Sequence, residues 1–289
     1  MFHDQLAIVA TDVAAHLDRV LASYPDQKVV SAMRYAVAGG KRLRAFLVIE
    51  GATLFDVPAE RALNAAAAVE ALHSYSLIHD DLPCMDDDDL RRGLPTVHVK
   101  WDQATAVLAG DALQTLCFAL LADPATHPDG AVRADLVASM ALAAGAKGMV
   151  YGQALDIAAE TAAAPLTLEE ITALQAGKTG ALIRWSAEAG ARLAGADIAP
   201  LGAYADALGL AFQIADDILD VEGDATKAGK RLNKDAEAGK ATFVSLLGLD
   251  QAKARAQDLV EQACAALDSY GEGAENLRQA ARFVISREM

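Results

Sequence analysis

The sequence predicts a single all-α domain over residues 1–289. Its apolar residues are dominated by alanine and leucine rather than by β-branched and aromatic types, and this composition favours helices over strands. Helical periodicity recurs along nearly the whole chain, and short turn-forming clusters separate the helical segments. Because 53% of the residues are hydrophobic, the chain can bury a large core.

The charge balance argues against two classes of partner. Forty acidic residues against 25 basic ones give a net charge of −15, so we expect neither nucleic-acid binding nor membrane insertion. Cys84, Cys117 and Cys264 lack the spacing of a metal site or a redox motif. We therefore expect reduced thiols and a cytoplasmic protein.

The first half of the chain predicts helices separated by short turns. The first twenty residues carry acids and no basic segment, which indicates an amphipathic helix rather than a signal or transit peptide. Turns follow at YPDQ (24–27) and FDVP (55–58). The most apolar stretch, 104–122, is interrupted by Asp111 and Gln114, so we expect a buried core helix and not a membrane span.

The helix predicted over 62–81 carries side chains on one face at every third or fourth position, namely Glu70, His73, Leu77 and Asp80. Pro83 lacks an N–H and disfavours helical angles at the residue before it, so the helix should end or bulge near 82–84. Asp80 and Asp86 lie six positions apart, and such a bulge could bring them together.

Aspartate fills six of the ten positions from 80 to 89, and Arg91 and Arg92 follow. Carboxylates held a few ångströms apart repel one another, so the cluster indicates either a bound cation or a solvated acidic turn. Aspartate oxygens suit a hard ion such as Mg²⁺ or Ca²⁺, and the spacing is not that of an EF-hand. Two guanidinium groups beside the cluster favour a metal site that also holds phosphate oxygens.

The second half of the chain predicts turns at ADPATHPDG (122–130) and AAAPLT (162–167), and then a helix that opens with the capping box TLEE (167–170). In that helix two glycines flank Lys178 and Thr179, which predicts a kink that frees backbone carbonyl groups. A tight helix-packing position is the alternative explanation. The polar, glycine-bearing segment 222–240 is predicted to be a loop, either functional or a plain solvated connection.

A second acidic cluster lies on the helix predicted over 204–223. Apolar side chains occupy one side of this helix, and polar side chains occupy another, namely Gln213, Asp216, Asp217 and Asp220. Three carboxylates on one face of an apolar helix are costly unless they are paired or bind a metal ion. The two clusters together therefore suggest a cavity in which both bind ions.

These motifs resemble those of the short-chain trans-prenyl diphosphate synthases, and within that family most closely those of the bacterial farnesyl diphosphate synthases. They run in the family's order, as GGKRLR, HSYSLIHDDLPCMDDDDLRRG, GQALD, GKTGALI, FQIADDILD and GKAT. The DDILD cluster differs from the second metal motif of terpene cyclases. The resemblance implies an isoprenoid synthase fold, in which antiparallel helices surround a deep central cavity, and a homodimer.

The resemblance also implies roles for individual residues. The aspartates expected to bind three Mg²⁺, with Mn²⁺ as an alternative, are Asp80, Asp81, Asp86, Asp216, Asp217 and Asp220. The residues expected at the allylic diphosphate are Arg91, Lys178, Lys230 and Lys240. Those expected at isopentenyl diphosphate are Lys41, Arg44, His73 and Arg92, although His73 could instead be a packed or solvated histidine. Thr179, Gln213 and the Lys178 carbonyl would stabilise a carbocation. Gln153 and Asp156 either support this site or form an ordinary buried pair.

The reaction implied by the resemblance is metal-dependent prenyl transfer. The allylic diphosphate ionises, the double bond of isopentenyl diphosphate attacks the carbocation, and a proton is lost. Tyr75, with Ser76 beside it and the insertion Pro83–Cys84, implies the C15 product farnesyl diphosphate. Geranyl and geranylgeranyl diphosphate are the alternative products. A terpene cyclase and a non-catalytic regulatory subunit are the rival classes, although a regulatory subunit would be expected to lack aspartates in one cluster.

Three residues depart from the family's pattern. Ala45 stands where proline is usual after GGKRLR, and Phe243 and Val244 stand where Tyr-Pro is usual. All three lie beside expected ligands rather than at them, so we expect them to alter only the local backbone.

Overall fold

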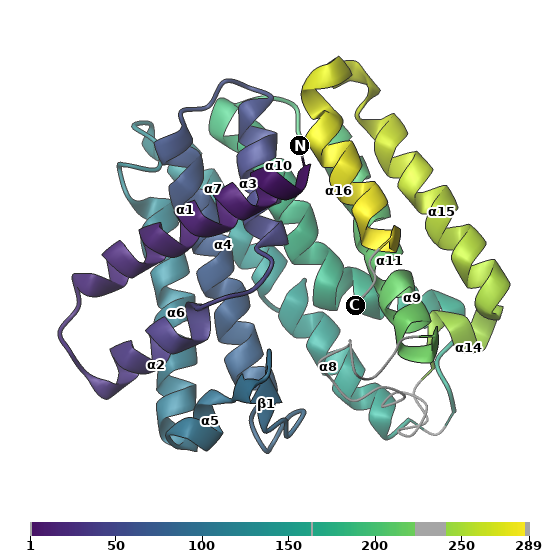
Figure 1. Ribbon diagram of the computed structural model, residues 1–289, viewed down its shortest axis with the longest axis horizontal. Coiled ribbons are helices and arrows are strands. Elements are labelled where there is room, and N and C mark those ends of the chain that lie inside the picture. Colours follow the sequence, from purple (N-terminus) through teal and green to yellow (C-terminus); the bar gives the residue numbers. More distant parts are fainter. Residues whose placement is uncertain (1, 163, 223–240, 287–289) are drawn as a thin grey trace. The chain divides into compact units, whose positions relative to one another are not determined.

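Most of the residues that the computed structural model describes, 2–162, 164–222 and 241–286, lie in helices (Figure 1). This confirms the all-α prediction. The chain divides into two compact units, one comprising Met1–Val137 with Arg192–Ala196 and the other Ala138–Ala191 with Asp197–Met289. The predicted loop 222–240, apart from Glu222, lies outside the described residues.

The first unit contains helices and one short hairpin. Its elements are α1 (Phe2–Ala22), α2 (Lys28–Val37), α3 (Leu43–Thr53), α4 (Ala59–Asp80), β1 (Leu90–Arg91), β2 (Leu94–Pro95), α5 (Val97–Lys100) and α6 (Gln103–Ala122). Helix α7 (Gly130–Ala144) begins in this unit and ends in the second. The turns predicted at 24–27 and 55–58 fall between helices, as expected.

Helix α4 is the centre of the first unit, because it packs against α6, α3, α1 and α2. Its middle turns carry five consecutive small side chains, Ala65–Val69, each with no exposed surface. Small side chains let the backbones of neighbouring helices approach closely while the apolar surface stays buried. Helix α4 is therefore held rigidly on several sides before it reaches the aspartates at its end.

Helix α6 corresponds to the apolar stretch at 104–122. It is the helix, among the residues that the structure describes, that is long and apolar enough to cross a membrane, and half of its most apolar window is buried. Leu113, Cys117 and Leu121 have no exposed surface and pack in the first unit. These contacts agree with the predicted core helix.

A buried ion pair fixes the segment GGKRLR against α4. Arg42 adopts a left-handed backbone conformation, with φ of 54°, just before α3. Its Nη1 lies 3.0 Å from Oε2 of Glu70, and both side chains are at most 4% exposed. The backbone N–H of Ala45 donates to the other oxygen of Glu70 at 3.0 Å. Since proline has no N–H, alanine at this position adds a hydrogen bond that the usual family residue could not make.

The second unit is built around a long helix, α11 (Ala199–Glu222), which packs against α15 and α16. The other elements are α8 (Met149–Glu160), α9 (Leu168–Gln175), η1 (Ala176–Gly180), α14 (Phe243–Leu247), α15 (Leu249–Ala266), η2 (Asp268–Ala274) and α16 (Glu275–Ser286). Helix α10 (Ala181–Ala194) begins in this unit, and its last residues belong to the first. Tyr204 is fully buried, and its hydroxyl donates to the Leu277 carbonyl at 2.8 Å. The contact ties α11 to α16.

The capping box and the kink are both present. Thr167 and Glu170 exchange hydrogen bonds at the start of α9. After α9 the chain forms a π-helical turn, η1, over the two glycines and Lys178–Thr179. Gly152 of α8 lies so close that a Cβ there would overlap the backbone of Gly177 and Lys178. The kink is therefore also a tight packing position, so both sequence interpretations hold.

The Arg42–Glu70 pair yields a stability prediction. In Arg42→Met, Glu70 keeps its charge in a buried site without its partner, so the free energy of unfolding should fall by about 3–5 kcal/mol. Urea denaturation, monitored by circular dichroism, measures the free energy of unfolding. The double variant Arg42→Met/Glu70→Gln removes both charges and should recover part of the loss. A single variant no less stable than the double would contradict the proposed cost of the unpaired carboxylate.

Candidate active site

The end of α4 forms the bulge that Pro83 predicts. Helix α4 ends at Asp80, and the chain turns through hydrogen bonds from Leu82 N to His79 O and from Met85 N to Leu82 O. The backbone N–H of Asp86 then donates to the carbonyl of Asp80 at 2.8 Å. The turn thus brings together two aspartates that lie six positions apart.

Arg91 and Arg92 lie in a short antiparallel hairpin, which the sequence analysis did not predict. Strands β1 and β2 pair Leu90 with Pro95 and Arg91 with Leu94. Arg92 and Gly93 at the turn have φ values of 54° and 75°. Positive φ at both central residues is the signature of a tight hairpin turn. In the sequence, the one indication of this turn was Gly93, since glycine adopts positive φ readily. The turn makes the two adjacent arginines project separately.

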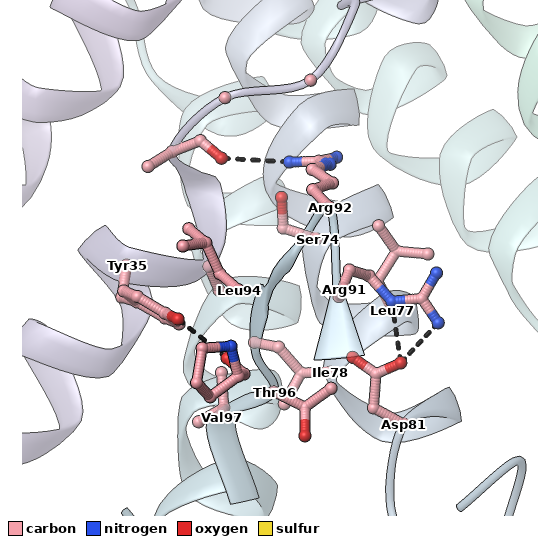
Figure 2. A pocket seen from close by; sticks show the side chains of 15 residues that line it. Tyr35, Ser74, Leu77, Ile78, Asp81, Arg91, Arg92, Leu94, Thr96 and Val97 are labelled. Atoms are coloured by element: carbon pink, nitrogen blue, oxygen red, sulfur yellow. Dashed lines mark hydrogen bonds and ion pairs between the residues drawn. The ribbon is translucent and has the colours of Figure 1, made fainter. Parts of the chain in front are cut away.

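Arg91 forms an ion pair with Asp81, the residue that follows α4 (Figure 2). Its Nε donates to Oδ1 of Asp81 at 2.7 Å, and Nη2 donates to the same oxygen. Asp81 is only 3% exposed, so burial raises the pKa of its carboxyl group, and the hydrogen bond from Arg91 opposes that rise. Without another cation, the arginine is the counter-charge of this buried aspartate.

A cavity of about 250 Å³ lies beneath the hairpin. Its lining is mostly apolar and includes three of the predicted site residues, Asp81, Arg91 and Arg92 (Figure 2). The Arg92 guanidinium donates to the Ala38 carbonyl at 3.0 Å. A Cβ on Gly40, which has a φ of 87°, would come within 2.9 Å of that guanidinium carbon, so a glycine here lets the loop approach it.

His73 lies near several arginines. Its pKa is well below the ordinary value of 6.5, first because of burial and then because of the charges of Arg44, Arg92, Arg91 and Arg42. The imidazole is therefore neutral at pH 7. Arg44 is itself held in a desolvating position that lowers its pKa, and its Nε is buried without a hydrogen-bond partner. Lys41 is exposed in the preceding loop.

The two residues predicted to limit product length point in different directions. Ser76 is half-buried, and its hydroxyl donates to the His73 carbonyl at 2.9 Å. Tyr75 is 7% exposed and contacts His79, on the side of α4 that faces α6. The structure thus places Tyr75 between these helices.

In the second unit, Lys178 of η1 forms an ion pair with Asp156 of α8, with Nζ and Oδ2 2.6 Å apart. Thr179 lies beside Lys178 in the π-helical turn. Gln153, one turn before Asp156, has a buried Nε2 without a hydrogen-bond partner. Asp156 therefore pairs with Lys178 rather than with Gln153, which corrects the alternative of a Gln153–Asp156 pair.

The second acidic cluster lies on α11, where Gln213, Asp216, Asp217 and Asp220 are all half-buried. Asp217 accepts a hydrogen bond of 2.6 Å from the backbone N–H of Phe243. The Phe243 side chain is 2% exposed. The departure at this position thus packs in the core, and its backbone directly contacts an expected metal ligand. Backbone contacts of this kind leave no signal in the sequence.

The donor chemistry of both clusters fits Mg²⁺ or Mn²⁺, since carboxylate oxygens are the ligands that hard divalent ions prefer. Within residues 2–162, 164–222 and 241–286, no three acidic, histidine or cysteine side chains form a ready group around one ion. The metal ligands therefore remain a prediction. Lys230 and Lys240 lie outside the described residues. Cys84, Cys117 and Cys264 are free thiols.

Comparison with known proteins agrees with this arrangement. The polyprenyl synthetase family model matches residues 26–280. The chain is 47% identical to the farnesyl diphosphate synthase of Escherichia coli K12 over 280 residues, 94% of this chain and 93% of that protein. It is 39% identical to the farnesyl diphosphate synthase of Haemophilus influenzae, with 99% of each chain covered.

A solved structure is similar to this chain in both sequence and fold. The crystal structure of an FPP/GFPP synthase from Zymomonas mobilis, in its apo form, superposes with a TM-score of 0.91 and 48% identity, and the alignment covers 98% of each chain. The family model, the relatives and the solved structure all extend over nearly the full sequence. The chain belongs to the polyprenyl synthetase family.

Proposed function

We propose that this protein is a farnesyl diphosphate synthase, a prenyltransferase that condenses isopentenyl diphosphate with dimethylallyl diphosphate and then with geranyl diphosphate. The observation that carries the proposal is similarity to farnesyl diphosphate synthases over more than nine-tenths of the chain, at up to 47% identity. Both aspartate clusters and the basic residues between them lie within the matched region. A chain that had lost catalysis would be free to lose them.

The proposed metal ligands are the aspartates of the two acidic clusters, Asp80, Asp81, Asp86, Asp216, Asp217 and Asp220. The ions are Mg²⁺, three in each active site, with Mn²⁺ as an alternative. When bound, they supply positive charge that stabilises the departing diphosphate. The turn after α4 supports the first set, because it holds the backbones of Asp80 and Asp86 at hydrogen-bond distance.

The allylic diphosphate is proposed to contact Arg91, Lys178, Lys230 and Lys240. Asp81 and Asp156 hold Arg91 and Lys178 in place, and the two cationic side chains are still 33% and 27% exposed, so both can accept phosphate oxygens. Prepositioned cations act on a leaving group without reorganising during the reaction. Cleavage of the carbon–oxygen bond then leaves an allylic carbocation and free diphosphate.

Isopentenyl diphosphate is proposed to bind Lys41, Arg44, His73 and Arg92. The buried Nε of Arg44 supports this assignment, because a desolvated guanidinium group whose Nε lacks a hydrogen-bond partner is stabilised by an anion. The neutral imidazole of His73 could donate to a phosphate oxygen without adding charge repulsion among the arginines.

Carbon–carbon bond formation needs a protected carbocation. The π-helical turn at Lys178 and Thr179 disturbs the regular helical hydrogen bonding, so its carbonyl oxygens and the Thr179 hydroxyl are available to the cation together with Gln213. The double bond of isopentenyl diphosphate attacks the cation, and the loss of one proton from the adduct gives the new double bond. The products are the longer prenyl diphosphate, diphosphate and a proton.

The chain is further proposed to act as one catalytic domain, since the family match at 26–280 crosses both units. Free thiols and the acidic composition favour a cytoplasmic location. A homodimer is supported by α6, on which Leu108 and Val107 are 54% and 40% exposed. Adjacent exposed apolar side chains on one helix are typical of a subunit interface.

Product analysis tests the function. After incubation with isopentenyl diphosphate, Mg²⁺ and either dimethylallyl or geranyl diphosphate, dephosphorylation should release farnesol as the main alcohol in gas chromatography. With farnesyl diphosphate as the allylic substrate, little elongation is expected. Mainly geraniol or geranylgeraniol would correct the product length. Turnover of geranyl diphosphate without isopentenyl diphosphate would indicate a cyclase. If the folded protein converts none of these substrates, a regulatory subunit would be indicated.

Substitution of the aspartates tests the metal site. Asp80→Asn and Asp216→Asn each remove one anionic ligand, so kcat at saturating Mg²⁺ should fall at least about 100-fold. Asp87→Asn is the matched control, because Asp87 is exposed and its φ of 50° is tolerated by asparagine. Equal losses in all three variants would mean that net charge, and not ligation, is responsible.

Sedimentation velocity tests the homodimer. We expect a dimer at micromolar concentration, and Leu108→Glu should shift it towards the monomer, since a charge would be buried in the interface. Leu168→Glu, at a position 42% exposed on α9, is the control and should leave the dimer intact. A monomeric wild-type protein would overturn the proposal.

A further inference from the structure

Tyr75 is held in place by side chains from both α4 and α6. Its ring packs edge-on against His79, one turn further along α4, with centroids 5.3 Å apart and planes at 88°. Gln114 of α6 makes a polar contact with its hydroxyl group. With 7% exposure, Tyr75 has little freedom to turn away from these neighbours.

Gly110 of α6 creates the space that His79 occupies. A Cβ at this position would overlap the His79 ring at Nε2 and Cδ2 and would come within 2.9 Å of Cε1. In that space His79 Nε2 donates to the Val107 carbonyl at 3.1 Å, which locks the ring orientation and the tautomer. The glycine thus fixes the imidazole, and the imidazole supports one side of Tyr75.

The contacts follow the antiparallel course of the two helices. Tyr75 of α4 contacts Gln114 of α6, whereas His79, which lies later in α4, contacts the earlier α6 residues Gly110 and Val107. Helices α4 and α6 also pack closely along their length (Figure 1). Tyr75 therefore cannot swing without breaking a contact to one helix or the other.

We propose that Gln114, His79 and Gly110 are positioning residues that fix the Tyr75 ring and thereby set the length of the prenyl product. The inference rests on the proposed function and on the role of Tyr75 in limiting chain growth that the family resemblance implies. A ring held only by its own rotamer could tilt to admit a further isoprene unit, because burying five more apolar carbons favours elongation. Side chains that never touch the substrate would in this way determine specificity.

Gln114→Met tests the proposal, since methionine has a similar length and cannot reproduce the polar contact. The rate of the first condensation should be unchanged, while the ratio of geranylgeranyl to farnesyl product should rise about fivefold, as expected when one neutral polar contact is lost. Gln103→Met, at an exposed position on the same helix, is the matched control and should leave the ratio unchanged. Tyr75→Ala is the positive control and should give the longest products.

Two further variants make the test decisive. Gly110→Ala should displace His79 and shift products in the same direction. Tyr75→Phe, Gln114→Met and the double variant form a double-mutant cycle. The effects of the two substitutions on product ratio and on melting temperature should be non-additive, because each substitution removes the same contact. An unchanged product ratio in Gln114→Met and Gly110→Ala, or additive effects in the cycle, would overturn the inference. If the wild type transfers no prenyl group, the proposed function fails, whereas the melting-temperature cycle still reports whether Gln114 holds Tyr75.

Discussion

Repulsion among carboxylates is the constraint on which the first unit depends. Six aspartates follow closely on the end of an otherwise apolar helix, and such charges are stable only when solvent or cations compensate them. The structure shows compensation by solvent for some of these aspartates and by a cationic side chain for another. Asp86 and Asp87 are exposed to solvent, whereas Asp81 is buried and takes its compensation from Arg91. The hairpin therefore carries the arginine that compensates the charge of Asp81, and the same arginine is available to a phosphate group.

Opposite charges are paired in the same way elsewhere in the chain. Glu70 holds Arg42, and Asp156 holds Lys178. The first pair is almost fully buried and fixes the glycine-rich loop, so its role is structural. The second leaves part of the lysine exposed, as does the Asp81–Arg91 pair. The difference in exposure distinguishes cations that maintain the fold from cations that can still meet a ligand.

Glycines let functional side chains lie close to the backbone of a neighbouring segment. Gly152 lets α8 approach the π-helical turn at Lys178, Gly110 admits the His79 ring, and Gly40 admits the Arg92 guanidinium group. In each case a single Cβ would overlap or crowd either a residue of the proposed site or the histidine that positions Tyr75. Rigid packing at these positions holds functional groups with a precision that loops alone rarely provide.

Local chemistry let the sequence determine the helical class, the capping box at Thr167, the bulge after Asp80 and the kink at Lys178. A missing N–H, a paired cap or two nearby glycines act within a few residues, so their effects can be predicted without knowledge of the fold. The sequence also placed the first aspartate cluster at the end of one helix and the second on the face of another. Tertiary structure alone decided that Arg91 pairs with Asp81, that Lys178 pairs with Asp156, and that Tyr75 faces α6. With 40 acidic and 25 basic residues, spacing cannot select the partners, because each pair joins segments that only packing brings together.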